Sequence, residues 1–191
     1  FDMDTLFEKF LSYLFRKSNL NFIEQSKIDS YSNRNHTVSI KPDFIIKSDD
    51  SICVVDAKWK LIDNRKQLYG LDSQNFWQIH SYMNLVDTKK EINGYFIVPK
   101  NSEYLDDLIV FKNLDSTRNN ISVIAIDFSL DFKDIVENYS FSLVNNELLI
   151  NYKIPIVLDE FRIYTKSFNL KNLVNDFNFV ILLGQKSLVI F

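Results

Sequence analysis

The sequence predicts an α/β protein with a mixed central sheet flanked by helices. Residues 3–17 repeat apolar side chains at helical spacing, and residues 92–99 and 120–128 are apolar runs typical of buried strands. A second helical pattern, residues 73–87, precedes these strands. Alternation of helices and strands favours an α/β layer architecture. A hydrophobic content of 46% with only 3 Gly and 3 Pro indicates one packed globular core rather than a linker-rich array.

The two helices carry their own start signals. Asp4 or Thr5 can cap the first helix, and Ser73 can cap the second. In the first helix the apolar positions are Met3, Leu6, Phe7, Phe10, Leu11 and Leu14. Glu8 lies at the flank of this stripe, where it is either a solvated side chain or a carboxylate aimed at the edge of a sheet. The two tryptophans, Trp59 and Trp77, are interpreted as core or edge-of-core aromatics.

Residues 37–60 predict two strands joined by a tight turn at residues 48–51. A turn centred on Asp49-Asp50 makes the numbers of opposed residues sum to 99, so Asp43 faces Asp56. Directly opposed residues project from the same face of a sheet, and so do residues two apart on one strand. The pattern therefore groups Asp43, Asp56 and Lys58 at the end of the hairpin away from the turn.

This grouping has a chemical consequence. Two adjacent carboxylates resist ionising together unless a cation lies between them, and Mg²⁺ is typically held by one or two carboxylates with waters and phosphates. Lys58 could then orient or deprotonate a water, or neutralise charge on a phosphate. The same spacing also fits a hairpin end with solvated charges, in which Lys58 simply pairs with an aspartate. The register alone does not decide between the two.

Composition limits the classes of function. A net charge of −3 is not the basic footprint of an easily recognised nucleic-acid binder, although a metal site concentrates acids that count toward this total. The single cysteine, Cys53, makes no internal disulfide, which fits a reducing compartment. One cysteine and two histidines do not build a structural zinc site. No apolar run approaches the ~18 residues of a membrane span.

The segment Pro42-Asp43, followed by Asp56-Ala57-Lys58 after a short hydrophobic run, resembles the signature of the PD-(D/E)XK nucleases. Glu8 on the first helix, the Gln78…Tyr82 pair on the second, and the strand at 94–99 extend the resemblance. The order of these motifs along the chain and the segment DAKWK at residues 56–60 are most similar to the nuclease domain of McrC-type restriction subunits, of the McrBC and LlaJI-like systems. The resemblance covers roughly residues 3–128.

The resemblance implies a restriction-endonuclease-like core and a Mg²⁺-dependent DNA endonuclease in which Mn²⁺ can substitute. It implies metal binding by Asp43, Asp56, the Ala57 carbonyl and Glu8, with Lys58 and Gln78 completing the catalytic set. The segment after the hairpin is locally basic. The expected DNA contacts are Lys60, Arg65, Lys66 and Tyr82, although the basic residues also fit a solvated surface loop.

The resemblance also implies partners: double-stranded DNA, an McrB-like AAA+ GTPase or ATPase motor, and a second copy of the chain on DNA. No Gly-rich phosphate-binding motif is present, so this chain is not expected to be the motor. The expected setting is phage defence in the cytoplasm of a bacterium or archaeon. Two alternatives stay open: a repair or recombination nuclease of the same fold, and a non-catalytic interaction module that retains the nuclease fold.

The pattern changes after the core. Residues 129–191 predict a β-rich extension packed on a nuclease core of residues 1–128, with a hairpin turn at Asn145-Asn146. This extension either completes the core or serves as a dimerisation or DNA-positioning element.

Overall fold

The structure is a computed structural model that describes residues 2–32, 34, 36–63, 65–86, 89–100, 108–112, 119–129, 131–156, 182–184 and 187–190. The chain divides into two compact units, Phe1–Ile150 and Asn151–Phe191. In the second unit β11 (Ile154–Ile156), β13 (Ser187–Ile190) and β12 (Leu182–Gly184) form an antiparallel sheet in that order. A division into compact units does not test where a nuclease core ends, so the predicted nuclease core of residues 1–128 stays a prediction.

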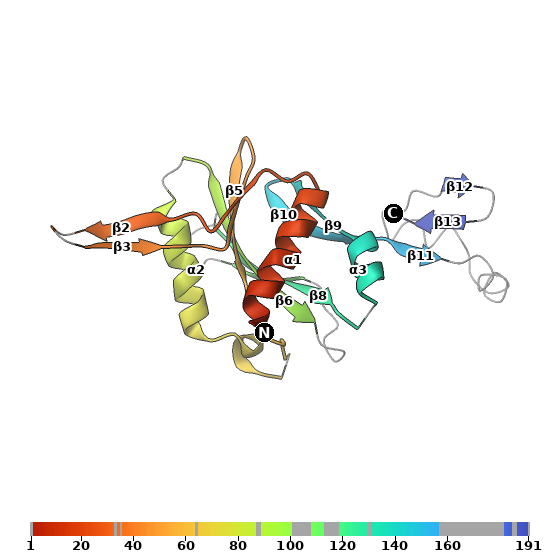
Figure 1. Cartoon of the computed structure of the whole chain (residues 1–191), viewed down its shortest axis with the longest axis horizontal. Helices are drawn as coiled ribbons and strands as arrows, with labels where there is room; N and C mark the ends of the chain where they lie inside the picture. The colour runs from red at the N-terminus through yellow and green to blue at the C-terminus, as the bar shows by residue number, and fades with distance from the viewer. Residues whose placement is uncertain are drawn as a thin grey trace. The chain divides into compact units, whose positions relative to one another are not determined.

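The first unit is built on a six-stranded mixed sheet with the order β1-β4-β5-β6-β8-β7 (Figure 1). Its strands are β1 (Phe22–Glu24), β4 (Phe44–Lys47), β5 (Ser51–Ala57), β6 (Glu91–Lys100), β7 (Leu108–Phe111) and β8 (Ile121–Asp127). The pairs β5–β6 and β6–β8 are parallel, whereas β1–β4, β4–β5 and β7–β8 are antiparallel. The sequence-based expectation of a mixed central sheet is therefore confirmed.

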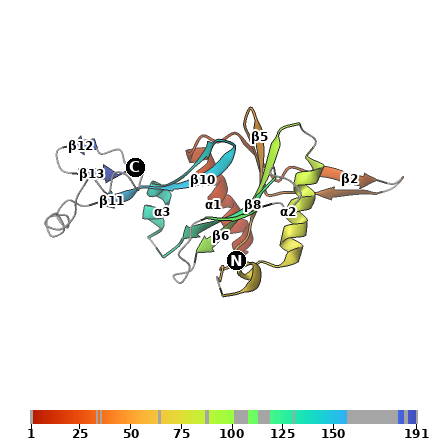
Figure 2. The same cartoon turned by 180° about the vertical axis from the view of Figure 1, so that it is seen from behind.

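Helices cover both faces of this sheet. The helix α1 (Met3–Lys17) lies in front of the sheet in Figure 1, α2 (Ser73–Leu85) lies behind it, and the order reverses in Figure 2. Phe7, Leu11 and Phe15 of α1 pack against one face, while Ile79 and Met83 of α2 pack against the other. Gly94 of β6 lies so close to α2 that a side chain would not fit there: an added Cβ would lie 2.7 Å from Met83 Sδ. The result is a three-layer α/β/α arrangement.

The caps of both helices differ from the sequence-based expectation. Asp2, rather than Asp4 or Thr5, caps α1 by accepting hydrogen bonds from the Asp4 and Thr5 backbone N–H groups. Asp72, rather than Ser73, caps α2 in a reciprocal capping box with Asn75. Both corrections have one reason: a carboxylate stands just ahead of the expected cap and accepts from the first free backbone N–H groups.

The first strand predicted within residues 37–60 is in fact two strands. The segment β3 (Thr37–Ile40) pairs with β2 (Ile28–Ser32) in a separate two-stranded sheet, and β4 belongs to the central sheet. Pro42 separates them, because it has no N–H for a ladder and restricts the backbone of Lys41. The short 3₁₀ segment η1 (Gln67–Gly70) lies in the connection from β5 to α2.

The hairpin of β9 (Tyr139–Val144) and β10 (Glu147–Tyr152) follows α3 (Phe132–Asn138). Asn145 and Asn146 both have positive φ, which confirms the predicted turn. Phe141 and Leu148 are buried in the core on the α1 side, and the Leu148 N–H donates to the Tyr95 hydroxyl at 2.9 Å. This hairpin therefore completes the core of the first unit.

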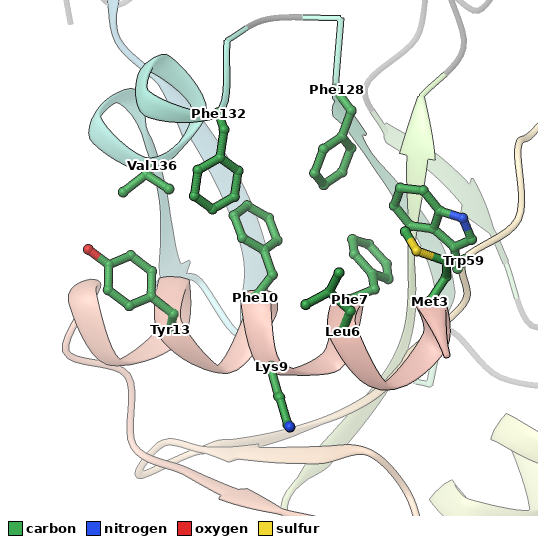
Figure 3. Close-up of a pocket in the computed structure, with 10 residues that line it drawn as sticks. All are labelled: Met3, Leu6, Phe7, Lys9, Phe10, Tyr13, Trp59, Phe128, Phe132 and Val136. Carbon is green, nitrogen blue, oxygen red and sulfur yellow. The ribbon is translucent and has the colours of Figure 1, made fainter. Parts of the chain in front are cut away.

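An apolar groove of about 710 Å³ lies between α1 and α3 (Figure 3). Phe10 and Phe132 face each other in it, and Trp59 stacks edge-on against Phe7 at a centroid distance of 5.5 Å. Trp59 is thus an edge-of-core residue, as expected. The same expectation for Trp77 is wrong: its side chain is 69% exposed, because it lies on the outer face of α2. None of the predicted site residues lines this groove.

Candidate active site

The register of β4 against β5 places the two key aspartates side by side. Phe44 pairs with Val55 and Lys47 with Ile52, which is the predicted register, and Asp43 lies one residue beyond the last pair. The Asp43 carboxylate accepts a hydrogen bond from the Ala57 N–H at 2.7 Å, so its side chain reaches across to β5. The backbone of Asp43 is fixed as well, because its carbonyl accepts from the Gln25 N–H at 2.7 Å.

Asp56 is the most deeply buried acid of the site. It is 2% exposed, and Lys58 Nζ lies 2.8 Å from its Oδ2. Among the described residues, the charged contact with Lys58 is the one interaction that compensates this oxygen for its burial. Burial of the carboxylate carries a desolvation cost, which the Lys58 ammonium offsets and which a bound metal cation would offset further.

Burial and mutual repulsion change the acidities of this group. Burial raises the pKa of Asp43 to about 7, and the charges of Asp56 and Glu8 add to the effect. Burial also raises the pKa of Asp56, against the opposing charge of Lys58. For Lys58, burial lowers the pKa, but the charge and hydrogen bonding of Asp56 outweigh it and leave the pKa above its usual value. The ammonium form of Lys58 is therefore stabilised.

These features fit a divalent cation. Asp43 and Asp56 converge, and the buried Oδ2 of Asp56 contacts Lys58 alone among the described residues. Within the described part of the chain, no set of three or more His, Cys, Asp or Glu side chains is arranged to hold a metal. The donor set is thus a pair of carboxylates, which suits Mg²⁺ because this ion keeps several waters and takes phosphate oxygens as further ligands. The ligand role of the Ala57 carbonyl stays a prediction.

The second helix adds two side chains from the same face of the sheet. Lys58 Nζ donates to Gln78 Oε1 at 3.4 Å, and Gln78 Nε2 donates to the Tyr82 hydroxyl at 2.6 Å. One turn of α2 separates Gln78 and Tyr82, so they stack on one helical face. A continuous polar chain therefore runs from Asp56 to Tyr82. Tyr82 is only 6% exposed, which leaves little of it for the predicted direct contact with DNA.

Glu8 lies close to the aspartates but does not join them. Its carboxylate accepts a hydrogen bond from Gln25 Nε2 at 3.0 Å, and Lys41 Nζ donates to Gln25 Oε1 at 2.8 Å. Glu8, Gln25 and Asp43 line a small cavity of about 240 Å³. The structure thus places Glu8 within electrostatic reach of Asp43, on the helix that covers the opposite face of the sheet. Nothing in the sequence pattern singled out Gln25 or Lys41.

The basic residues after β5 are dispersed. Lys60 Nζ lies 3.8 Å from Asp72 Oδ2, and Arg65 forms hydrogen bonds with Asp63 at 3.0 and 3.3 Å. Lys66 is exposed. The carboxylates that pair with Lys60 and Arg65, those of Asp72 and Asp63, are close to them in the sequence. Contact of these basic residues with DNA stays a prediction.

Comparison with known proteins gives two matches. A family model described as "McrBC 5-methylcytosine restriction system component" matches residues 1–97, just over half of the chain. The fold resembles a chain in the solved half-complex of a tetradecameric assembly of Thermococcus gammatolerans McrB AAA+ hexamers with bound McrC. That match has a TM-score of 0.52 at 19% identity and covers 71% of this chain and 31% of the other. No curated protein sequence matches.

Proposed function

The chain belongs to the family of McrBC 5-methylcytosine restriction system components, and we propose that it carries the DNA-cleaving centre of an McrC-type subunit. The proposed reaction is Mg²⁺-dependent hydrolysis of a phosphodiester in double-stranded DNA by a PD-(D/E)XK core. The observation that carries this proposal is the convergence of Asp43, Asp56 and Lys58 from neighbouring strands, with a buried Asp56 carboxylate whose charge is offset by Lys58.

Each residue of the proposed centre has a distinct task. Asp43 and Asp56 would hold the metal, and Mg²⁺ bound there would supply Lewis-acid activation of a water and charge neutralisation at the phosphate. Lys58, with its pKa raised, favours the ammonium form, so its proposed role is to hold the attacking water and to offset negative charge on the phosphate. This favours electrostatic assistance over proton abstraction by Lys58.

Gln78 and Tyr82 act on the lysine rather than on the phosphate. The Gln78 amide is held at both ends, accepting from Lys58 and donating to Tyr82. A side chain held in this way loses less conformational freedom when the substrate binds. We assign Glu8 an outer role, in which its carboxylate acts through water and its charge reinforces the affinity of the aspartate pair for a cation.

We also propose that the subunit works with an McrB-like AAA+ motor. The support is the family and the likeness to the half-complex of McrB AAA+ hexamers with bound McrC. Recognition of the target and movement along DNA would belong to the motor, since this sequence has no phosphate-binding Gly-rich motif. Cutting both strands of a duplex requires two such centres, so a second copy on DNA is expected.

The test is nicking of supercoiled plasmid with Mg²⁺ or Mn²⁺, by the chain alone and together with its motor and nucleotide. Asp56→Ala and Lys58→Ala are each expected to lower the rate about 10²-fold or more, because each removes a charge that acts in the transition state. Asp49→Ala and Lys47→Ala are matched controls on exposed positions of the same hairpin and should cut normally. Unchanged cutting by both site variants would overturn the proposal, and absence of cutting under every condition would favour a non-catalytic module.

A further inference from the structure

A two-stranded ribbon, β2 with β3, extends away from the central sheet in both views (Figures 1 and 2). Within the described residues these strands pair only with each other. The ribbon is tied to the sheet at its base, where Ile28 and Ile40 are opposed and pack against the core on the α2 side. The apolar side chains farther out, Tyr31 and Val38, are not part of that core, so packing within the fold does not explain why they are apolar.

The ribbon has an apolar face that continues from the core into solvent. Tyr31 is paired with Val38, and a register shift after Asp29 returns Tyr31 to the face of Ile28 and Ile40. Tyr31 is 77% exposed and Val38 is 58% exposed. The Tyr31 ring and the Val38 side chain are therefore adjacent and exposed. They lie on the same face of the ribbon as Ile28 and Ile40, which pack against the core on the α2 side.

The ribbon together with the residues that flank it, 25–41, has a net charge opposite in sign to that of the whole chain. Residues 25–41 hold three cations (Lys27, Arg34 and Lys41) and one acid (Asp29), whereas the chain has a net charge of −3. Asp29 is offset locally, because Lys27 Nζ lies 3.8 Å away and Ser39 Oγ donates to it at 2.6 Å. The ribbon and its flanking residues thus combine positive charge with an exposed apolar pair, a combination suited to contact with nucleic acid.

The ribbon leads directly into the proposed cleavage centre. Only Lys41 and Pro42 separate β3 from Asp43, and Lys41 donates through Gln25 to Glu8. Val38 is five residues from Asp43. At about 3.3 Å per residue of extended chain this separation is at most about 16 Å, which is at most about five base pairs at 3.4 Å each.

We propose that the β2–β3 ribbon lies in the major groove of the duplex that is cut, within about five base pairs of the scissile phosphate. The major groove is about 12 Å wide and admits a two-stranded β-ribbon. Tyr31 and Val38 contact base edges and methyl groups there, and Arg34 contacts a phosphate. This inference rests on the proposed function, because it takes duplex DNA as the substrate of the Asp43–Asp56 centre.

The experiment compares the full chain with a Tyr31→Ser/Val38→Ser double variant and an Arg34→Gln variant. Binding to a labelled duplex is measured with Ca²⁺ over a series of salt concentrations, and cleavage with Mg²⁺ and the motor over a series of DNA concentrations. The double variant is expected to bind about tenfold more weakly with an unchanged salt dependence. Arg34→Gln is expected to lower the slope of log affinity against log salt by about 1.

Both variants should reach the wild-type turnover at saturating DNA, with the loss confined to KM. Asp56→Ala provides the contrast, since it should bind the duplex and fail to cut. If the wild-type chain cuts and the double variant binds with unaltered affinity, the ribbon proposal is overturned and the proposed function stands. If the wild type neither binds nor cuts duplex DNA, both are overturned. A change in oligomeric state by light scattering, without a change in DNA affinity, would assign the apolar pair to a second copy instead.

Discussion

Replacing Asp43 by asparagine isolates the free-energy cost of holding two carboxyl groups side by side. Asparagine has nearly the same shape and keeps an oxygen that can accept from the Ala57 N–H at 2.7 Å. It removes only the charge. The variant therefore tests whether the Asp43–Asp56 arrangement is destabilising without a cation, as a metal site should be.

The size of the effect follows from the acidity of Asp43. Its pKa rises from 3.8 to about 7 on folding, so the native state binds more protons than the unfolded state between these values. Stability contributed by the protonated form is therefore lost as pH rises through this window. Each tenfold change in proton affinity corresponds to about 1.4 kcal/mol, which sets an upper limit of about 4 kcal/mol at alkaline pH. Solvent screening at the partly exposed side chain lowers this figure.

The assay is chemical denaturation of both proteins at pH 5 and pH 8, each with EDTA and with Mg²⁺. In EDTA the free energy of unfolding of the wild type should fall by up to about 2–3 kcal/mol more than that of Asp43→Asn between the two pH values. Mg²⁺ should restore stability to the wild type at pH 8, because the ionised pair binds it, and should do little for the variant. If the free energy of unfolding changes equally with pH in the two proteins in EDTA, the raised pKa assigned to Asp43 is refuted. Equal stabilisation of both by Mg²⁺ would refute Asp43 as a ligand.

Two further predictions concern α2. Tyr82→Phe removes the hydroxyl that accepts from Gln78 Nε2 at 2.6 Å, so cleavage should fall about 5-fold, the equivalent of about 1 kcal/mol, with a small change in melting temperature. A normal rate in this variant would show that the Gln78 amide needs no such support. Gly94→Ala places a Cβ 2.7 Å from Met83 Sδ and should destabilise the fold by about 1–3 kcal/mol, measured by urea denaturation. Recovery in a Gly94→Ala/Met83→Ala double variant would identify the clash as the cause.

Local pattern alone determined the hairpin and the two aspartates. The turn centred on Asp49-Asp50 fixes which residues are opposed, and the observed pairs of β4 with β5 follow that register. The helical extents near residues 3–17 and 73–87 were likewise set by apolar spacing within each segment. Such features depend on neighbours in the sequence, which is why a single sequence predicts them.

Only the tertiary structure decided what surrounds the pair. It separated β3 from β4 and sent β3 out with β2 as a ribbon, it buried Asp56 to 2% exposure, and it placed Gln78 beside Lys58. It also held Glu8 on the helix that covers the other face of the sheet. These outcomes depend on how distant segments pack, and burial and ion pairing between them have no local periodicity from which they could be predicted.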